Sequence, residues 1–342
     1  MRIGVLSGGG DAPGINAVIR AVVRRGIQTY QDEIVGIREG WRGLLEGYFV
    51  PLDFEAVAGI LPKGGSILGT SRTNPFKRER GPEQIMENAK KAGLEAVIAI
   101  GGDDTLSVAH KMADYGLECI GVPKTIDNDL AGTDYTFGFH TAVAIATEAL
   151  DRLHSTAEAH NRVIILEVMG RYTGHIALAA GLAGGADVIL IPEKPFDIDE
   201  VCEYIRRRQK RGRNFSLIVV AEGAKPKGGR EIVYSERIDE FGHISLGGIG
   251  YYLAKEIEQR TGIETRVVVL GHLQRGGSPT AFDRILATRF GVAAVDLAHQ
   301  GKFGYMVALQ GSKIVPVPLK DVVGKRKTVD IELYKLASVF FG

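Results

Sequence analysis

Short runs of β-branched and aliphatic residues alternate along the chain with longer segments in which apolar residues recur every three to four positions. The short runs are apolar on both faces, which is typical of strands in a parallel sheet that helices cover on both sides. The longer segments have the spacing of amphipathic helices. The predicted strands are 2–6, 34–37, 96–100, 119–122, 163–168, 188–191, 217–221 and 266–270. The predicted helices are 14–30, 82–92, 105–115, 139–156, 171–182, 197–211, 247–261 and 279–298. This alternation predicts an α/β architecture.

Size and composition are those of a globular protein with many tight loops. The 342 residues suit about two domains of ordinary size. The formal net charge is +1 and no long run of like charges occurs, so we expect no nucleic-acid or membrane partner. Glycine accounts for 45 residues and follows apolar runs, which predicts tight strand-to-helix loops. Cys119 and Cys202 lack a metal-ligand spacing, and we expect two reduced, buried thiols in a cytoplasmic protein.

Two glycine-rich loops follow predicted strands, where ligands bind in parallel α/β sheets. The first, Gly8-Gly9-Gly10-Asp11, precedes a predicted helix and offers backbone N–H groups to an oxyanion. A tight turn without a ligand is the alternative. The second, Gly101-Gly102-Asp103-Asp104-Thr105, places two carboxylates together, which predicts a magnesium ion. An Asx turn at the start of the next helix is the alternative there.

The loop Pro123-Lys124-Thr125-Ile126-Asp127-Asn128-Asp129 follows the fourth predicted strand. In an extended loop Asp127 and Asp129 point to the same side, beside Lys124 and Thr125. Such carboxylates can deprotonate a hydroxyl or hold a metal ion, and the lysine can bind a phosphate.

Cationic residues follow further glycine turns. Arg72 follows Gly69-Thr70-Ser71, Arg171 follows Met169-Gly170, and His272 and Arg275 share the loop 271–277. Arginine and histidine in such turns suit a phosphate monoester or a sugar hydroxyl. Together with the two carboxylate clusters, these loops predict direct in-line phosphoryl transfer, which needs positioning and charge neutralisation more than a covalent nucleophile.

These loops, in this order, closely resemble the 6-phosphofructokinase family. The similarity extends from Gly8-Gly9-Gly10-Asp11 to Gly271-His272-Leu273-Gln274-Arg275-Gly276-Gly277-Ser278-Pro279. It implies two three-layer α/β domains with mainly parallel sheets. Residues 1–138 and about 251–304 are assigned to a domain that binds the donor phosphates and magnesium. Residues 139–250 and about 305–342 are assigned to the fructose 6-phosphate domain, with 225–243 as an insertion of unassigned role.

The resemblance implies a role for each matching residue. Asp127 is the implied base that takes the proton from the sugar 1-hydroxyl, with Arg171 and Lys124 as catalytic cations. Asp103 is the implied ligand of Mg²⁺, with Asp129 as a second candidate. The implied donor-binding residues are Gly10, Asp11, Arg72, Asp104, Thr105 and Lys124. The implied sugar-phosphate residues are Thr125, Asp127, Asp129, Arg162, Met169, Gly170, Arg171, Glu222, Arg266, His272 and Arg275. Arg162 and Arg266 match arginines that act from a neighbouring subunit, which implies a homo-oligomer, a dimer or tetramer, with shared active sites.

Two positions favour pyrophosphate over ATP as the donor. In the first acidic loop, ATP-dependent members of the family have the motif Gly-Gly-Asp-Gly, whereas this chain has Asp104 in place of the last glycine. Many ATP-dependent members also have glycine in place of Lys124. A carboxylate at Asp104 repels a nucleotide α-phosphate by roughly 4 kcal/mol at about 4 Å and an effective dielectric constant near 20. Val108 and Trp41 are expected to shape the space where adenine lies in ATP enzymes. The implied reaction is a reversible, pyrophosphate-dependent phosphorylation of fructose 6-phosphate to fructose 1,6-bisphosphate in glycolysis and gluconeogenesis.

Three other functions remain open from the sequence. An ATP-dependent 6-phosphofructokinase shares most of these loops. Nucleotide and lipid kinases share the Gly-Gly-Asp loop but lack the loop around Asp127 and the pair His272 and Arg275. A non-catalytic sugar-phosphate sensor does not need both Asp127 and Asp103.

Overall fold

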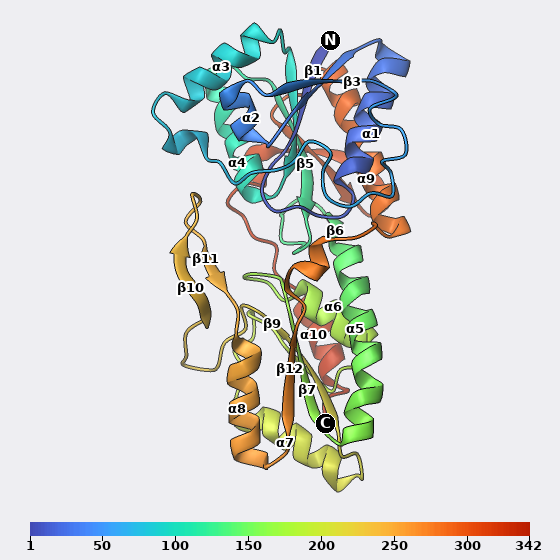
Figure 1. Ribbon diagram of the computed structural model, residues 1–342, viewed down its shortest axis with the longest axis vertical. Coiled ribbons are helices and arrows are strands. Elements are labelled where there is room, and N and C mark those ends of the chain that lie inside the picture. Colours follow the sequence, from blue (N-terminus) through green and yellow to red (C-terminus); the bar gives the residue numbers. More distant parts are fainter.

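The computed structural model describes the backbone of residues 1–342 and all side chains except those of residues 233–238 and 244–245. The chain forms two bodies stacked along its long axis, each built around its own sheet (Figure 1). We call the one that contains the amino terminus the first body and the other the second body. Both sheets are mainly parallel and helices pack on both faces, which confirms the predicted α/β class.

The first body has eight strands in the order β14-β13-β5-β4-β1-β2-β3, with β6 paired to β5. The central strands run parallel, and β14 and β3 add antiparallel edges. The bounds are β1 Arg2–Ser7, β2 Glu33–Ile37, β3 Phe49–Leu52, β4 Ala96–Gly101, β5 Cys119–Thr125, β6 Phe137–Gly138, β13 Tyr305–Gln310 and β14 Lys313–Pro318.

Side chains of the central strands alternate between two apolar cores of the first body. Ile98 and Ile100 of β4 belong to the core beneath α1 (Ile15–Arg25) and α9 (Ala281–His299). Val97 and Ala99 belong to the opposite core. The helices over that core are α2 (Trp41–Glu46), α3 (Gly81–Lys91) and α4 (Asp103–Met112). A side-chain period of two with both faces covered explains why the strand sequences are apolar throughout.

The second body repeats this plan on a parallel sheet in the order β12-β7-β9-β8. The bounds are β7 Val163–Val168, β8 Val188–Leu190, β9 Ser216–Ala221 and β12 Thr265–Val269. One face packs on α5 Phe139–His160, α6 His175–Ala183 and α10 Ile331–Ser338, and the other on α7 Ile198–Lys210 and α8 Ile249–Thr261. None of the helices described is both long and apolar enough to cross a bilayer.

The chain crosses between the bodies three times: from β6 to α5, from β12 to α9 and from β14 to α10. A buried hydrogen-bond pair joins two of these crossings. Asp283 lies on α9 and Thr141 on α5. Oδ2 of Asp283 accepts hydrogen bonds from the backbone N–H of Thr141, at 2.7 Å, and from its hydroxyl, at 2.6 Å. The carboxyl ends of both parallel sheets face this junction (Figure 1).

All eight predicted strands are present, but the sheets divide the chain differently from the predicted domain bounds. Within 251–304, α8 and β12 belong to the second body. Within 305–342, β13 and β14 complete the first sheet, because β13 pairs in parallel with β5 through Tyr305 and Met306. The expected insertion forms an antiparallel hairpin of β10 (Val233–Ile238) and β11 (Ile244–Leu246).

Candidate active site

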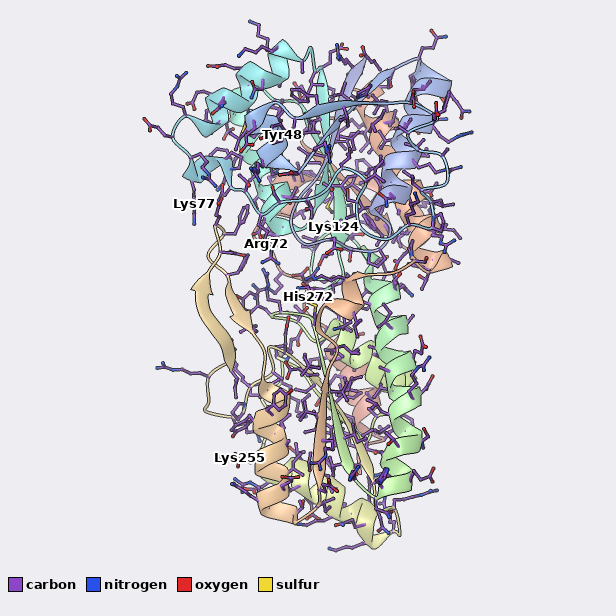
Figure 2. All side chains as sticks on the ribbon, in the orientation of Figure 1. Tyr48, Arg72, Lys77, Lys124, Lys255 and His272 are labelled. Carbon is purple, nitrogen blue, oxygen red and sulfur yellow. The ribbon has the colours of Figure 1, made fainter. Side chains whose placement is uncertain are left out.

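A cavity of about 160 Å³ lies between the two bodies. Most of its walls are formed by loops that follow β1, β4, β5 and β7. The cavity is therefore lined from the carboxyl ends of both sheets. Figure 2 shows Arg72 and Lys124 on the first-body side of the junction and His272 on the second-body side. The lining residues are Gly9, Gly10, Arg72, Gly102, Asp103, Asp104, Thr105, Lys124, Thr125, Asp127, Asp129, Arg171, Tyr172, His243, Arg275, Gly324, Lys325 and Arg326.

Lys124 brings a buried cation to the glycine loop after β1. Its Nζ donates hydrogen bonds to the backbone oxygens of Gly8, at 2.8 Å, and Gly10. Burial, followed by repulsion from Arg275, lowers the pKa of Lys124 to about 7. A bound anion would restore the charged form. A Cβ at Gly10 would lie 2.9 Å from an Arg275 guanidinium nitrogen, so a larger residue there would displace the end of that side chain.

The two adjacent carboxylates begin α4. Asp103 is the first helical residue, and its Oδ1 accepts the N–H of Gly324, at 2.8 Å, from the segment after β14. Oδ1 of Asp104 lies 3.1 Å from Nε2 of His243, on the β10–β11 hairpin. Neither carboxylate caps the helix, so the alternative of an Asx cap does not form. Burial raises the pKa of Asp103, although the hydrogen bond from the Gly324 N–H opposes this shift.

The loop after β5 places Asp127 and Asp129 in the same cavity. In the part of the chain that the structure describes, Oδ1 of Asp127 is buried without a hydrogen-bond partner. Burial and then repulsion from Asp127 raise the pKa of Asp129 to about 7. Thr125 lies beside them, and its Oγ1 accepts the Asp127 N–H at 3.0 Å. A proton donor or a cation would relieve this buried negative charge.

The carboxylates fit a magnesium ion that is held partly by substrate. Magnesium is commonly bound by one or two carboxylates together with phosphate oxygens and water. The described residues contain no cluster of three or more candidate metal ligands. Asp103 and Asp129, which line one cavity, are therefore sufficient only if phosphate oxygens complete the coordination.

The second body contributes Arg171 and Tyr172, which follow β7. The backbone N–H of Arg171 donates to Oε1 of Glu222 at 2.9 Å, which fixes the turn that carries the guanidinium. Burial, followed by repulsion from Asp127, raises the pKa of Glu222 to about 7. Arg275 bridges the bodies, since its guanidinium donates to the backbone oxygen of Asp11 at 3.1 Å.

Some predicted site residues lie outside the cavity lining. These are Asp11, Met169, Gly170, Glu222 and His272, which are close in sequence or by contact to lining residues, and the more distant Arg162 and Arg266.

Arg162 and Arg266 lie at the start of β7 and β12, the end of the second sheet away from the cavity. Both guanidinium groups contact the Glu264 carboxylate, and Nε of Arg162 lies 2.7 Å from Oε2 of Glu264. Seven residues of extended chain separate Arg162 from Met169, a distance of roughly 20 Å. These arginines therefore do not meet the cavity of their own chain.

Val108 and Trp41 also lie outside the cavity lining, contrary to the expectation that they shape a space for adenine. Both are 2% exposed and belong to the core beneath α4. Nε1 of Trp41 donates to the backbone oxygen of Thr105 at 3.2 Å, so Trp41 supports the start of α4.

Sequence reasoning missed the residues that other segments bring to the cavity: Tyr172, His243, Gly324, Lys325 and Arg326. The guanidinium of Arg326 lies 4.4 Å from the centre of the Tyr172 ring. The available signal was the run Gly324-Lys325-Arg326-Lys327, which has the same pattern of cations after a glycine that identified Arg72. The predicted strands do not include β13 and β14, so the sequence prediction does not place this run after a strand of the first sheet.

Glu222 predicts a pH dependence of stability. Its pKa rises from an ordinary 4.5 to about 7 on folding, so the protonated carboxyl favours the folded state and this advantage is lost as the pH rises through about 7. We expect the Glu222→Gln variant to match the wild-type melting temperature near pH 5 and to exceed it by about 2–4 °C near pH 8. Differential scanning calorimetry of the free proteins measures this. The exposed control Glu158→Gln should show no such trend, and a gain for Glu222→Gln that is equal at both pH values would contradict the assignment.

Comparison with known proteins gives one consistent family. The Phosphofructokinase family model matches residues 2–298. Pyrophosphate–fructose 6-phosphate 1-phosphotransferase of Streptomyces coelicolor is 59% identical over 343 residues and covers 100% of both chains. ATP-dependent 6-phosphofructokinase 3 of the same organism is 54% identical over 329 residues and covers 96% of each chain. The solved structure of a pyrophosphate-dependent phosphofructokinase from Marinobacter aquaeolei has a TM-score of 0.84 at 25% identity, covering 97% of this chain and 86% of that one. The chain therefore belongs to the phosphofructokinase family.

Proposed function

We propose that this phosphotransferase moves a phosphoryl group from pyrophosphate to the 1-hydroxyl of fructose 6-phosphate, forming fructose 1,6-bisphosphate and phosphate. The observation that carries the proposal is the buried Lys124 in a cavity that Asp104 also lines. The Streptomyces coelicolor relative at 59% identity is named for pyrophosphate and fructose 6-phosphate. Phosphoryl transfer from pyrophosphate to a sugar hydroxyl is closer to thermoneutral than transfer from ATP. We therefore expect a reversible reaction that serves both glycolysis and gluconeogenesis. The buried, unpaired thiols of Cys119 and Cys202 suit a cytoplasmic location, which cell fractionation tests.

The charges around the cavity select the donor. Pyrophosphate ends after two phosphate groups, so its terminal oxygens can pair with Lys124 and Arg72, which both line the cavity. A nucleotide has to extend a third phosphate past these cations and towards Asp104, where like charges repel.

Asp127 is proposed as the general base. Its buried Oδ1, which has no hydrogen-bond partner among the described residues, is free to accept the proton of the sugar 1-hydroxyl. The hydroxyl oxygen then forms a bond to the near phosphorus of pyrophosphate while the bridging P–O bond breaks and phosphate leaves. Arg171 and Lys124 neutralise the charge on the transferring group. Mg²⁺ held by Asp103 and Asp129 would supply charge neutralisation and alignment of the donor oxygens.

The donor assignment predicts a change in specificity on removal of one carboxylate. Wild-type protein with Mg²⁺ should have a higher kcat/KM for pyrophosphate than for ATP, and chelation of the metal should abolish turnover. The Asp104→Gly variant should raise kcat/KM for ATP by about ten- to a thousandfold, because the like charge near the α-phosphate is lost. Steady-state assays with both donors and fructose 6-phosphate measure this. The control Asp114→Gly removes an exposed carboxylate outside the cavity and should leave the donor preference unchanged.

Other results of the same assay identify the alternative functions. A wild-type preference for ATP would make the protein an ATP-dependent 6-phosphofructokinase like the 54% identical relative. No ATP gain in Asp104→Gly would remove Asp104 from donor selection. Binding of fructose 6-phosphate without turnover from either donor would make it a sugar-phosphate sensor.

The base assignment predicts a loss confined to turnover. Asp127→Asn should lower kcat by about a hundredfold or more and change KM for fructose 6-phosphate little, because general-base catalysis contributes about 10²–10⁴-fold. Asp151→Asn on the exposed face of α5 is the control. A variant with near-normal kcat would remove Asp127 from this role.

We propose that the active enzyme is a homo-oligomer, a dimer or tetramer, in which Arg162 and Arg266 bind the sugar 6-phosphate of a neighbouring subunit. This is supported by their separation from the cavity of their own chain. It is also supported by the exposed apolar side chains of Val269 and Leu273, 44% and 68% exposed, at the other end of the edge strand β12 and in the loop that follows it.

Shared sites predict complementation between inactive variants. Mixed oligomers of Arg162→Ala and Asp127→Ser proteins, reassembled from separated subunits, should recover part of the wild-type activity. A site that combines Asp127 of an Arg162→Ala subunit with Arg162 of an Asp127→Ser neighbour then has both residues intact. Activity assays on mixtures whose mixed composition is verified by mass spectrometry measure the recovery, and no recovery in such oligomers would contradict a shared site.

A further inference from the structure

The turn of the β10–β11 hairpin reaches from the second body to the first body beside the cavity. Figure 1 shows the hairpin standing apart from the second sheet with its turn directed at the first body, and in Figure 2 Arg72 lies beside that turn. We call residues 239–243 the hairpin tip. They include two carboxylates and a histidine, and no role follows for them from the phosphoryl-transfer site described above.

Glu240 and Phe241 attach the hairpin tip to the first body. The two carboxylate oxygens of Glu240 accept the Arg78 guanidinium at 2.7 Å and the backbone N–H of Asn74 at 2.9 Å. The Phe241 ring packs against the first-body core beneath α4. The tip is therefore held against the first body by one apolar contact and by hydrogen bonds from both a charged group and the backbone.

Asp239 is oriented within the tip and faces a cation of the cavity. Its Oδ1 accepts the backbone N–H groups of Phe241 and His243, each at 3.0 Å. Its Oδ2 lies 3.4 Å from the guanidinium of Arg72. Although burial disfavours the charged form, these N–H groups hold the pKa of Asp239 below its ordinary value. Asp239 thus presents a full negative charge to Arg72.

His243 contacts the other donor-selecting residue. Its Nε2 lies 3.1 Å from Oδ1 of Asp104, and its side chain lines the cavity. A carboxylate only accepts hydrogen bonds, so Nε2 carries the proton in this contact. The hairpin tip therefore pairs Arg72 with a carboxylate and Asp104 with the N–H group of a histidine. Arg72 and Asp104 both line the same cavity.

We propose that the hairpin tip is part of the donor site and that its two side chains change donor affinity in opposite directions. Asp239 competes with a pyrophosphate oxygen for Arg72 and weakens binding. His243 donates a hydrogen bond to Asp104 and thereby reduces its repulsion of pyrophosphate, which strengthens binding. The inference rests on pyrophosphate as the donor and assigns two further specificity residues to that site.

The test compares KM for pyrophosphate in variants of Asp239 and His243 that each carry a single substitution. Asp239→Asn retains the oxygen that holds the turn and removes the charge at Arg72. We expect it to lower KM for pyrophosphate about two- to fivefold, the scale of a partly exposed ion pair. His243→Ala leaves Asp104 unpaired and should raise that KM about three- to tenfold. His243→Gln, which can still donate to Asp104, should recover part of the loss.

Two controls separate a donor role from a structural role. Glu231→Gln removes a carboxylate of the same insertion that pairs with Lys225 at 3.5 Å, away from the tip, and should leave KM for pyrophosphate unchanged. KM for fructose 6-phosphate should stay constant in all four variants. Calorimetric titration with pyrophosphate alone should show the same opposite shifts in Kd, independently of turnover.

The outcomes distinguish this inference from the proposed function. If the wild-type protein neither binds nor uses pyrophosphate, the donor assignment itself is wrong. If it uses pyrophosphate but Asp239→Asn and His243→Ala shift KM and Kd in the same direction, or shift KM for fructose 6-phosphate equally, the tip has only a structural role. Unchanged constants in both variants would also overturn the proposal.

Discussion

The carboxyl ends of two parallel sheets face one another across a single junction, and the arrangement of the site depends on this constraint. A parallel strand is followed by a loop and then a helix, so each strand brings a loop to the same edge of its sheet. Facing edges place loops of the first body opposite loops of the second. Residues as distant in sequence as Gly10, Asp103, Asp127 and Arg171 consequently line one cavity. No loop needs to be long for this to happen, because the strand directions alone supply the convergence.

The charges gathered at this junction are not balanced within the free protein. The pKa of Lys124 is lowered while those of Asp129 and Glu222 are raised, and burial is the main cause for each group. Burial disfavours the charged form of both acids and bases, so the cavity is electrostatically unfavourable without a ligand of mixed charge. A phosphate donor with a divalent cation has that character, since its oxygens compensate the lysine and its metal compensates the carboxylates. The same groups that reduce stability in the free protein are therefore the ones that would recognise such a ligand.

The elements that the sequence predicted correctly are those whose signals are local. Strands buried on both faces are continuous apolar runs, and the loops at their ends carry glycine beside charge, so β1, β4, β5 and β7 and their loops were found. Arg326 and His243 were missed because their position depends on edge pairing. β13 joins the first sheet only through its contact with β5, and the hairpin tip reaches the first body through Arg78 and Asn74. Such contacts leave no periodic pattern near the residues concerned.

The two sides of the junction are closed by different kinds of contact, and this difference bears on how a ligand could enter. On the side of α5 and α9, a carboxylate of Asp283 is buried completely and accepts both donors of Thr141. Breaking that contact leaves buried polar groups without partners, so this side favours a fixed geometry. On the hairpin side, Asp239 and Arg72 form a partly exposed ion pair, for which water and anionic ligands can substitute. An incoming anion therefore exchanges one partner of Arg72 for another on the hairpin side, while the buried hydrogen bonds opposite keep the two sheets aligned.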